Sequence, residues 1–232
     1  MVNLNRIMNE GERVTHLYPN DSYFAHLSIY AFAVDYCRDG QVLDAGCGAG
    51  YGSAYLVDHG AKHVTGVDCS RYAIDFCTKQ FSRINLEFRR MDIEDISGLP
   101  ERSYDLIFAS NVLEHINNIA SFLDAAARLL RPQGCLIVAV PPVMDQARLE
   151  SDTSNPYHLH RMTPNGWKAI LSSYFEDIEC FGHICTRSDV ILDFANTPTQ
   201  CKIDEHDFSF PSCTVEGIVS LGSLTALFVA KK

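Results

Sequence analysis

The chain has 232 residues, a hydrophobic content of 47% and a formal net charge of −10 at pH 7. This length and composition are enough to bury one full core. The acidic balance argues against nucleic acid as the main partner, because phosphate binding needs a basic face. We therefore expect an acidic globular protein with no nucleic-acid partner.

The cysteines and the apolar runs indicate the compartment. Nine cysteines are scattered along the chain and none forms a C-x-x-C pair, which favours reduced thiols and argues against a zinc site. The first residues lack a secretory signal pattern, and the longest apolar run, about residues 135–143, is too short to span a bilayer. We expect a cytoplasmic protein with no metal and no membrane span.

Strand and helix patterns alternate along the chain, which predicts a parallel, doubly wound sheet. The expected fold class is α/β: a Rossmann-like, seven-stranded, mostly parallel sheet with an antiparallel last strand, helices on both faces and an N-terminal helical lid. After a first strand that ends at Asp44, strands are expected at residues 63–67, 86–89, 104–109, 135–140, 175–181 and 224–230. Helices are expected at residues 71–81, 119–130 and 164–173, and a turn at residues 131–134.

No repeat or clear linker divides the chain, so residues 1–232 are expected to form a single domain. Within it, residues 1–37 would be the lid, 38–142 the cofactor-binding core and 143–232 the substrate side. Residues 183–222 are expected to be an irregular insertion.

The most informative segment is QVLDAGCGAGYGS, residues 41–53, where three glycines follow the acid that ends a buried strand. Glycine lets the backbone turn sharply and lets a ligand lie against bare N–H groups. The dinucleotide fingerprint G-x-G-x-x-G does not fit, since Tyr51 or Ser53 stands where its last glycine should be. The pattern D-x-G-x-G-x-G resembles motif I of the class I S-adenosylmethionine-dependent methyltransferases.

Further segments extend this resemblance over residues 38–140, through VTGVD, MDIED, YDLIFASNVLEHI and LLRPQGCLIVAVPP. It implies S-adenosylmethionine as the cofactor, with the ribose on Asp68, the adenine on Asp92 and Ile93, and the methionine end on Ser110 or Asn111. The predicted cofactor-binding residues are Arg13, Tyr23, Asp44, Gly46, Cys47, Gly48, Gly50, Asp68, Cys69, Asp92, Ile93, Ser110 and Asn111. The alternatives are helix capping by Asp68 and Asp92 and a plain turn at Asn111.

Two of these residues belong to the N-terminal segment. Arg13 could pair with the methionine carboxylate, and Tyr23 could face the sulfonium through cation–π attraction. The alternative is a helix whose apolar face packs on the core. The flanks GER at residues 11–13 and NPYH at residues 155–158 resemble bacterial methyltransferases associated with glycan biosynthesis.

Methyl transfer to a hydroxyl needs a group that takes up the acceptor's proton, and histidine suits this task. His158 and His160 follow the fifth core strand and should lie at the mouth of the cleft. They are the predicted bases, with His115 as a third candidate. Ordinary hydrogen bonds that pin the connection are the competing interpretation.

The sequence therefore predicts a methyltransferase that acts on a small molecule, with an oxygen acceptor favoured. A sugar or glycan precursor is the first acceptor class, a quinone or polyketide-like phenol the second, and an amino sugar or amine, methylated at nitrogen, the third. A protein that binds S-adenosylmethionine without transferase activity is the alternative from another class. The oligomeric state stays open, with a homodimer as one option.

Overall fold

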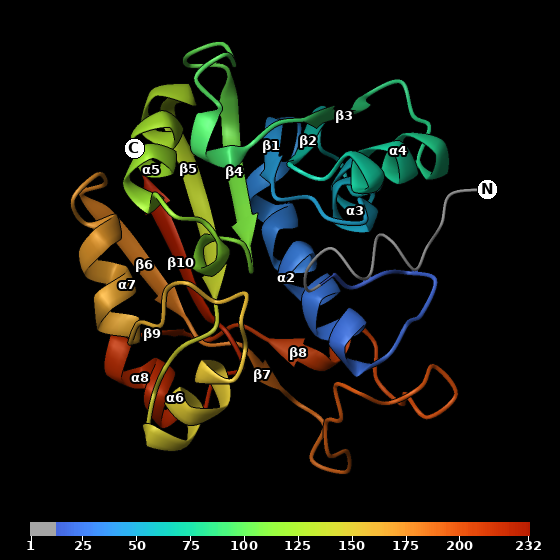
Figure 1. The fold of residues 1–232 in the computed structure, drawn as a ribbon, viewed down its shortest axis with the longest axis vertical. Helices are drawn as coiled ribbons and strands as arrows, with labels where there is room; N and C mark the ends of the chain where they lie inside the picture. Colours follow the sequence, from blue (N-terminus) through green and yellow to red (C-terminus); the bar gives the residue numbers. More distant parts are fainter. Residues whose placement is uncertain (1–12) are drawn as a thin grey trace. The chain divides into compact units, whose positions relative to one another are not determined.

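The computed structural model describes residues 13–232, which form two compact units. The first contains residues 13–92 and 185–209, and the second contains residues 93–184 and 210–232 (Figure 1). The predicted lid starts in residues 1–12, which lie outside the described part. The expected single-domain organisation stays a prediction. Among residues 13–232, no helix is long and apolar enough to cross a bilayer.

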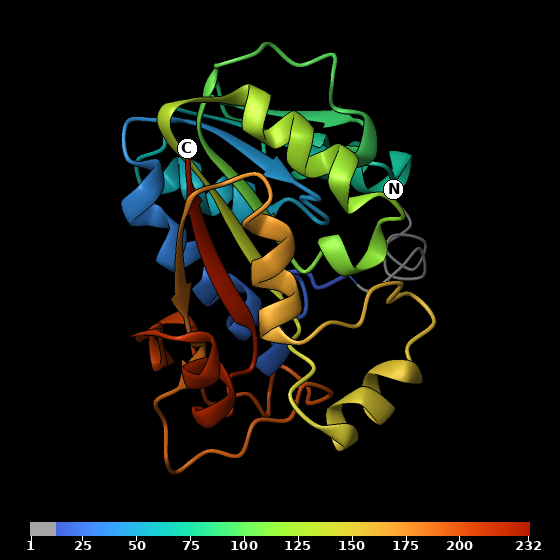
Figure 2. The ribbon, with the colours of Figure 1, turned by 90° about the vertical axis from the view of Figure 1, so that its left-hand side faces the viewer.

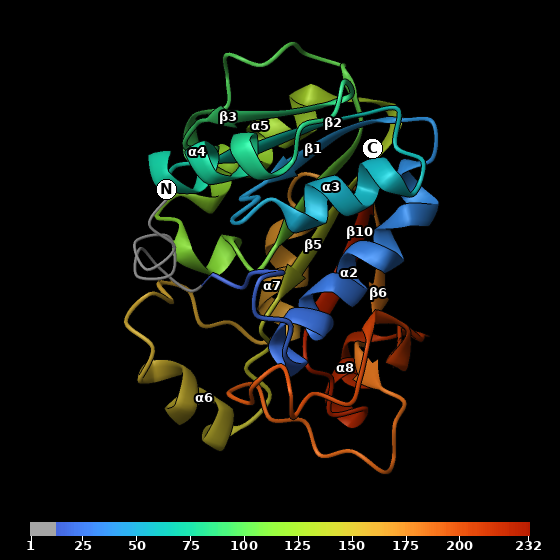
Figure 3. The ribbon, with the colours of Figure 1, turned by 90° about the vertical axis from the view of Figure 1, so that its right-hand side faces the viewer.

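The first unit is a small parallel α/β assembly. Its strands lie in the order β3-β2-β1 and pair in parallel. The helices α3 and α4 contact these strands (Figure 3), and α4 begins at the N-cap Ser70, whose hydroxyl accepts from the Ala73 N–H. The elements are α2 (Asp21–Cys37), β1 (Gln41–Ala45), α3 (Tyr51–Asp58), β2 (His63–Asp68), α4 (Arg71–Gln80) and β3 (Leu86–Arg90).

The second unit holds five strands in the order β4-β5-β10-β6-β9. The first two are parallel, whereas β10 is antiparallel to both β5 and β6. The helices α5 and α7 lie on one face of these strands (Figure 2). The elements are β4 (Tyr104–Ser110), η2 (Leu113–His115), α5 (Ile119–Leu129), β5 (Leu130–Val140), α6 (Gln146–Thr153), α7 (Pro164–Leu171), β6 (Asp177–Phe181), β9 (Ser212–Cys213), α8 (Val215–Ser220) and β10 (Ala226–Lys231).

The expected strands and helices all appear with the expected type, but the turn expected at residues 131–134 is wrong, because these residues lie within β5. The other differences also lie in the later part of the chain. The main sheet has eight strands, where seven were expected, because the short β9 pairs with β6. Residues 183–222 are more regular than predicted, since they also contain α8 and the two-residue strands β7 (Ile184–Cys185) and β8 (Phe208–Ser209). Helix α6 was not predicted. β5 begins at Leu130, not at residue 135, because Leu130 already pairs with Tyr104 before the register shifts.

A buried acid joins three elements of the first unit. Asp44, at the end of β1, is 1% exposed and accepts from the Ser53 hydroxyl at 2.5 Å and from the Tyr30 hydroxyl at 3.3 Å. Burial raises the pKa of Asp44 to about 7. Next to Ser53, a Cβ added to Gly52 would lie 2.1 Å from Cζ of the Tyr30 ring. Helices α2 and α3 therefore meet through an aromatic ring, a glycine and one carboxyl group.

Replacing Gly52 by alanine tests this close approach. The added methyl group meets a buried ring that cannot move freely, so Gly52→Ala should lower the free energy of unfolding by about 1–3 kcal/mol. Denaturant unfolding followed by circular dichroism measures the change. Gly98→Ala is the matched control, because its Cβ would have no neighbour within 4 Å. Equal stability of the two variants would contradict the close packing of Gly52 against the Tyr30 ring.

The raised pKa of Asp44 predicts a pH dependence of stability. Below its ordinary value of 3.8 the group is protonated in both states, and between there and about 7 only the folded chain keeps the proton. The free energy of unfolding should therefore fall as the pH rises through this window. Asp44→Asn removes the titration, so its stability relative to the wild-type chain should increase from about pH 4 to pH 7. Parallel pH profiles of the two proteins in urea unfolding would rule this out.

Candidate functional site

The glycine-rich loop links β1 to α3. Gly46, Gly48 and Gly50 have φ values of 82°, 54° and 77°, in the left-handed region that favours glycine. A Cβ on Gly50 would lie 2.6 Å from the Cys77 Sγ, whereas a Cβ on Gly48 would have nothing within 4 Å. The loop is thus packed tightly on one side and open beside Gly48, as a ligand that approaches the backbone requires.

Asp68, the last residue of β2, organises the loop. One carboxylate oxygen accepts from the Gly48 N–H at 3.1 Å and the other from the Ser70 N–H at 2.8 Å. The alternative that Asp68 itself caps the helix is wrong, because the N-cap of α4 is Ser70, whose N–H donates to Asp68. Its carboxylate also lies beside the open face of Gly48, in a place that suits the ribose of an adenosyl cofactor.

The N-terminal residues Arg13 and Tyr23 have other partners in this structure. Arg13 donates from Nη2 to Asp68 at 3.0 Å, and both side chains are largely buried. Arg13 therefore lies at the predicted ribose acid rather than at a separate methionine site. The Tyr23 ring lies 5.0 Å from the ring of Tyr51, and burial raises its pKa to about 12.

The remaining predicted cofactor residues of the first unit differ in exposure. Cys47 is buried at 3%, and its pKa is raised by the neighbouring Cys77 thiol and by burial. Cys69 is exposed, and partial burial together with Asp68 raises its pKa. Asp92 is also exposed and follows the short segment whose Met91 N–H donates to the Asp68 carbonyl. Within this set, hydrogen bonds join Asp68 to Gly48 and to Arg13, and the Gly50 N–H donates to the Cys47 carbonyl at 2.9 Å.

In the second unit, the predicted residues after β4 form a tight turn. Asn111 has a φ of 51°, and its N–H donates to the Ala139 carbonyl at 2.7 Å. Its side-chain amide donates to the Ser110 hydroxyl at 3.1 Å. The turn predicted as the alternative for Asn111 is therefore present. Ile93 is buried at 5% in the short helix η1 (Ile93–Asp95).

The three predicted histidines are brought to one place by backbone hydrogen bonds. The Glu114 carbonyl, in η2, accepts from the N–H groups of Leu159 and His160 at 2.7 and 3.1 Å. These two hydrogen bonds hold the segment after α6 against η2. The His160 Nε2 then lies 2.8 Å from the Ile116 carbonyl, which is the pinning contact expected as the alternative to a base.

His115 and His158 differ from His160 because their rings meet edge to face, with centroids 4.9 Å apart and an interplanar angle of 66°. The His115 Nδ1 lies 3.0 Å from the Tyr157 carbonyl, and the His158 Nδ1 lies 2.5 Å from the Asp152 carboxylate. Both partners are acceptors, so each Nδ1 carries the proton and each Nε2 keeps its lone pair. The buried Glu114 carboxylate lies beside them, with its Oε1 3.8 Å from the His115 Nε2.

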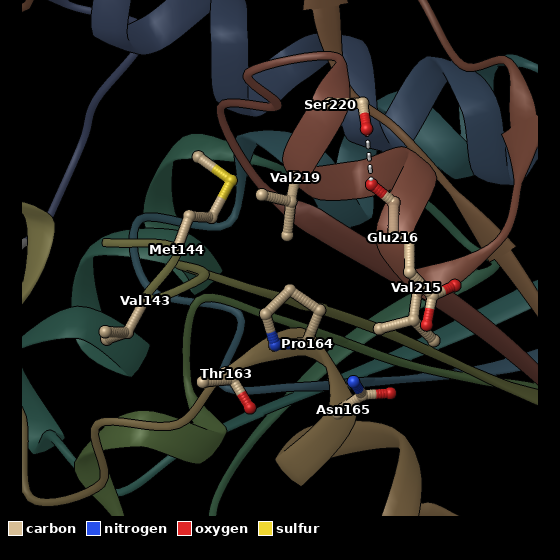
Figure 4. A pocket seen from close by; sticks show the side chains of 9 residues that line it. All are labelled: Val143, Met144, Thr163, Pro164, Asn165, Val215, Glu216, Val219 and Ser220. Atoms are coloured by element: carbon tan, nitrogen blue, oxygen red, sulfur yellow. Dashed lines mark hydrogen bonds between the residues drawn. The ribbon is translucent and has the colours of Figure 1, made fainter.

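A pocket of about 380 Å³ also lies within the second unit (Figure 4). The side chains of Met144, Pro164 and Val219 line it with apolar groups, and Glu216 stands at its side. The pKa of Glu216 is lowered by a hydrogen bond to its own backbone N–H at the start of α8. The lining residues are Val143, Met144, Thr163, Pro164, Asn165, Val215, Glu216, Val219 and Ser220.

Sequence reasoning missed several residues of these clusters. Asp152 orients His158 from six positions earlier, in a Ser/Asp/Thr-rich segment with no periodic pattern. Ser53 and Gly52 stand in the motif itself, but their contacts with Asp44 and Tyr30 depend on how α2 packs. The only signal in the sequence for these contacts was Ser53, a polar residue in the first helical turn after the glycine loop.

Comparison with known proteins identifies the fold and finds a methyltransferase domain in part of the chain. Residues 43–138 match the family model described as a methyltransferase domain. A probable S-adenosylmethionine-dependent methyltransferase from Mycolicibacterium smegmatis is 27% identical over 73% of this chain and 65% of its own length. A ubiquinone biosynthesis O-methyltransferase from Xylella fastidiosa is 37% identical over 43% of this chain and 41% of its own. The chain thus spans less than two thirds of the length of these relatives.

Solved structures agree on the architecture. The crystal structure of an S-adenosylmethionine-dependent methyltransferase from Thermotoga maritima aligns with a TM-score of 0.68 at 15% identity, over 91% of both chains. The predicted Rossmann-like α/β fold class is confirmed. The chain thus has the fold of solved S-adenosylmethionine-dependent methyltransferases, matches a methyltransferase domain over residues 43–138 and is similar in sequence to probable S-adenosylmethionine-dependent methyltransferases.

Proposed function

We propose that this protein transfers the methyl group of S-adenosylmethionine to an oxygen atom of a small molecule. The part of the proposal that concerns the methyl donor rests on the Asp68 carboxylate, which lies beside the open face of Gly48. A carboxylate at the end of the second strand can accept hydrogen bonds from ribose hydroxyls, while the glycine loop leaves room for the cofactor chain. In this proposal the other predicted cofactor residues keep their roles, whereas Arg13 shares Asp68 with the ribose.

The class of acceptor is inferred from the pocket of the second unit. The apolar pocket formed after β5 and by α8 has a volume of about 380 Å³, within the usual range for small ligands. Its lining supports a phenolic or polyketide-like ring as well as a sugar ring, and the ubiquinone O-methyltransferase relative supports oxygen as the accepting atom. Methylation of an amine is the second candidate, because the anionic Glu216 would favour a cation in this pocket.

His158 is the histidine that we propose activates the acceptor hydroxyl. The Asp152 carboxylate accepts from its Nδ1–H, which favours the tautomer whose Nε2 carries no proton. The His160 Nε2 lies at hydrogen-bond distance from the Ile116 carbonyl. His160 would therefore hold the segment after α6 in position and would not activate the acceptor. The remaining demands of methyl transfer are alignment of donor and acceptor and exclusion of water, because the sulfonium donor is already activated.

The partners and the location follow the same reasoning. We propose a cytoplasmic enzyme whose partner is its small-molecule acceptor, because nine cysteines without a paired spacing suit a reducing compartment.

Calorimetry with S-adenosylhomocysteine, followed by a methyl-transfer screen with phenols, sugars and amines, tests the proposal. We expect binding with one site per chain and transfer to at least one hydroxyl compound. Binding without transfer to any class would favour a cofactor-binding protein that is not a transferase. Transfer to amines alone would favour the second candidate.

The role of Asp68 predicts a specific loss. Asp68→Asn keeps the size of the side chain but removes its charge, so the affinity for S-adenosylhomocysteine should fall by about 10- to 100-fold, or about 1.5–3 kcal/mol for a hydrogen bond to a charged group. Asp75→Asn is the control, since Asp75 is exposed on α4 and pairs loosely with Arg71 at 3.8 Å. Unchanged affinity in Asp68→Asn would show that the ribose binds elsewhere.

The role of His158 predicts a loss of turnover without a loss of cofactor. His158→Ala should lower kcat by about 10²- to 10⁴-fold while the affinity for S-adenosylhomocysteine stays the same. His206→Ala serves as the control, because His206 is exposed on η3 (Glu205–Asp207). Turnover that survives in His158→Ala would remove His158 from the mechanism.

A further inference from the structure

The side chains of Glu114, His115 and His158 form a cluster of three metal-ligand types within the second unit, which we call the EHH cluster. One ligand atom from each lies within 4.8 Å of the others. Glu114 and His115 are neighbours in η2, whereas His158 comes from the segment after α6. The hydrogen bonds from the Leu159 and His160 N–H groups to the Glu114 carbonyl help to bring them together.

The hydrogen bonds around the two imidazoles set their tautomers for ligation. The His158 Nδ1–H donates to Asp152, and the His115 Nδ1–H donates to the Tyr157 carbonyl. Metal-binding histidines almost always make such a contact with a carboxylate or a backbone carbonyl, which fixes the ring and makes the other nitrogen more basic. Both Nε2 lone pairs are therefore in the form that a metal ion takes.

Asp152 is itself held in place. Its second oxygen lies 3.2 Å from the Arg161 Nε, and the Arg161 guanidinium also donates to the carbonyls of Asp152 and Asn155. The carboxylate is thus placed between a cation and the His158 ring. A carboxylate that is anchored in this way can fix the orientation of a metal-binding histidine, as such histidines require.

The distances are close to those that a metal ion requires. Ligand atoms about 2.1 Å from an ion in tetrahedral geometry are about 3.4 Å apart, and the Glu114 Oε1 lies 3.8 Å from the His115 Nε2. Small side-chain rotations would therefore complete the site. Glu114 is 1% exposed at its side chain, whereas His115 is 25% exposed, so the cluster is closed at the carboxylate and reachable at the imidazole.

We propose that the EHH cluster binds one divalent transition-metal ion of the zinc type, with a coordination position open to the acceptor. Two imidazoles and a carboxylate suit such borderline ions, and three protein ligands leave a place for an exogenous oxygen. The sequence alone argued against zinc on its cysteine spacing, and these ligands include no cysteine.

The consequence for the reaction rests on the proposed methyl transfer to oxygen. The ion would lower the pKa of the acceptor hydroxyl, so that its proton leaves to water. An oxygen lone pair then forms the bond to the methyl carbon. The carbon–sulfur bond breaks with its electron pair on sulfur, and S-adenosylhomocysteine leaves. His158 would then activate the hydroxyl through the ion and not by taking the proton itself.

Metal binding is tested on the untagged full chain after treatment with a chelator and desalting. Titration with Zn²⁺ against a chromophoric competitor should give one ion per chain, and Co²⁺ should give the visible absorption of a low-coordinate nitrogen–oxygen site. Glu114→Gln and His158→Ala should weaken Zn²⁺ binding by at least about 100-fold, and Asp152→Asn by about 10- to 100-fold. His206→Ala should bind as the wild-type chain does.

Circular dichroism on each variant shows whether it is folded, and Glu114→Gln preserves the size of the side chain should His158→Ala not fold. Absence of stoichiometric Zn²⁺ binding by the wild-type chain, or wild-type affinity in folded Glu114→Gln, would overturn the site. Methyl transfer that continues in excess chelator would overturn the metal-dependent step while the proposed function stands. Tight Zn²⁺ binding in a chain that methylates nothing would support the site and count against the proposed function.

Discussion

The carboxylate of Asp68 is the point on which the candidate cofactor site depends. It holds the Gly48 N–H, the Ser70 N–H and the Arg13 guanidinium at distances of 2.8–3.1 Å. Those three groups belong to the glycine loop, to the residue that caps α4 and to the N-terminal segment. One charged side chain therefore determines where the loop lies, where a helix begins and where the N-terminal segment is attached. A cofactor ribose that binds there must share a carboxylate whose two oxygens already accept hydrogen bonds.

A comparable constraint organises the second unit, but there it comes from the backbone. The Glu114 carbonyl accepts two N–H groups from the segment that follows α6, and this contact sets His158 opposite His115. The side-chain contacts with Asp152 and Tyr157 then fix the orientation of each ring. The chemistry proposed for the acceptor thus depends in part on two ordinary peptide hydrogen bonds, which hold the residues after α6 at η2 together with the contacts of His115 and His160.

The motif segment shows how far sequence reasoning extends. The strands that end at Asp44 and Asp68, the glycine loop and the alternation of strands with helices were readable, because hydrophobic periodicity and glycine spacing are local properties. The fold class followed from them. The partners of Arg13 and Tyr23 were not readable, because a side chain in a segment ahead of the first strand can reach any of several groups. Helix α6 and the regular parts of residues 183–222 were also missed, since their polar, irregular sequences carry little periodicity.

The sequence by itself determined the order of the elements and predicted the family and the cofactor. These depend on residues that are close together in the chain, and local backbone preference and burial are enough to place them. Only the tertiary structure decided which of the predicted histidines could act together. It placed His160 on a carbonyl, His158 on an acid that no pattern had indicated, and a buried glutamate beside two imidazoles. Such groupings arise from contacts between residues some 40 positions apart, and packing, not spacing, brings them within reach.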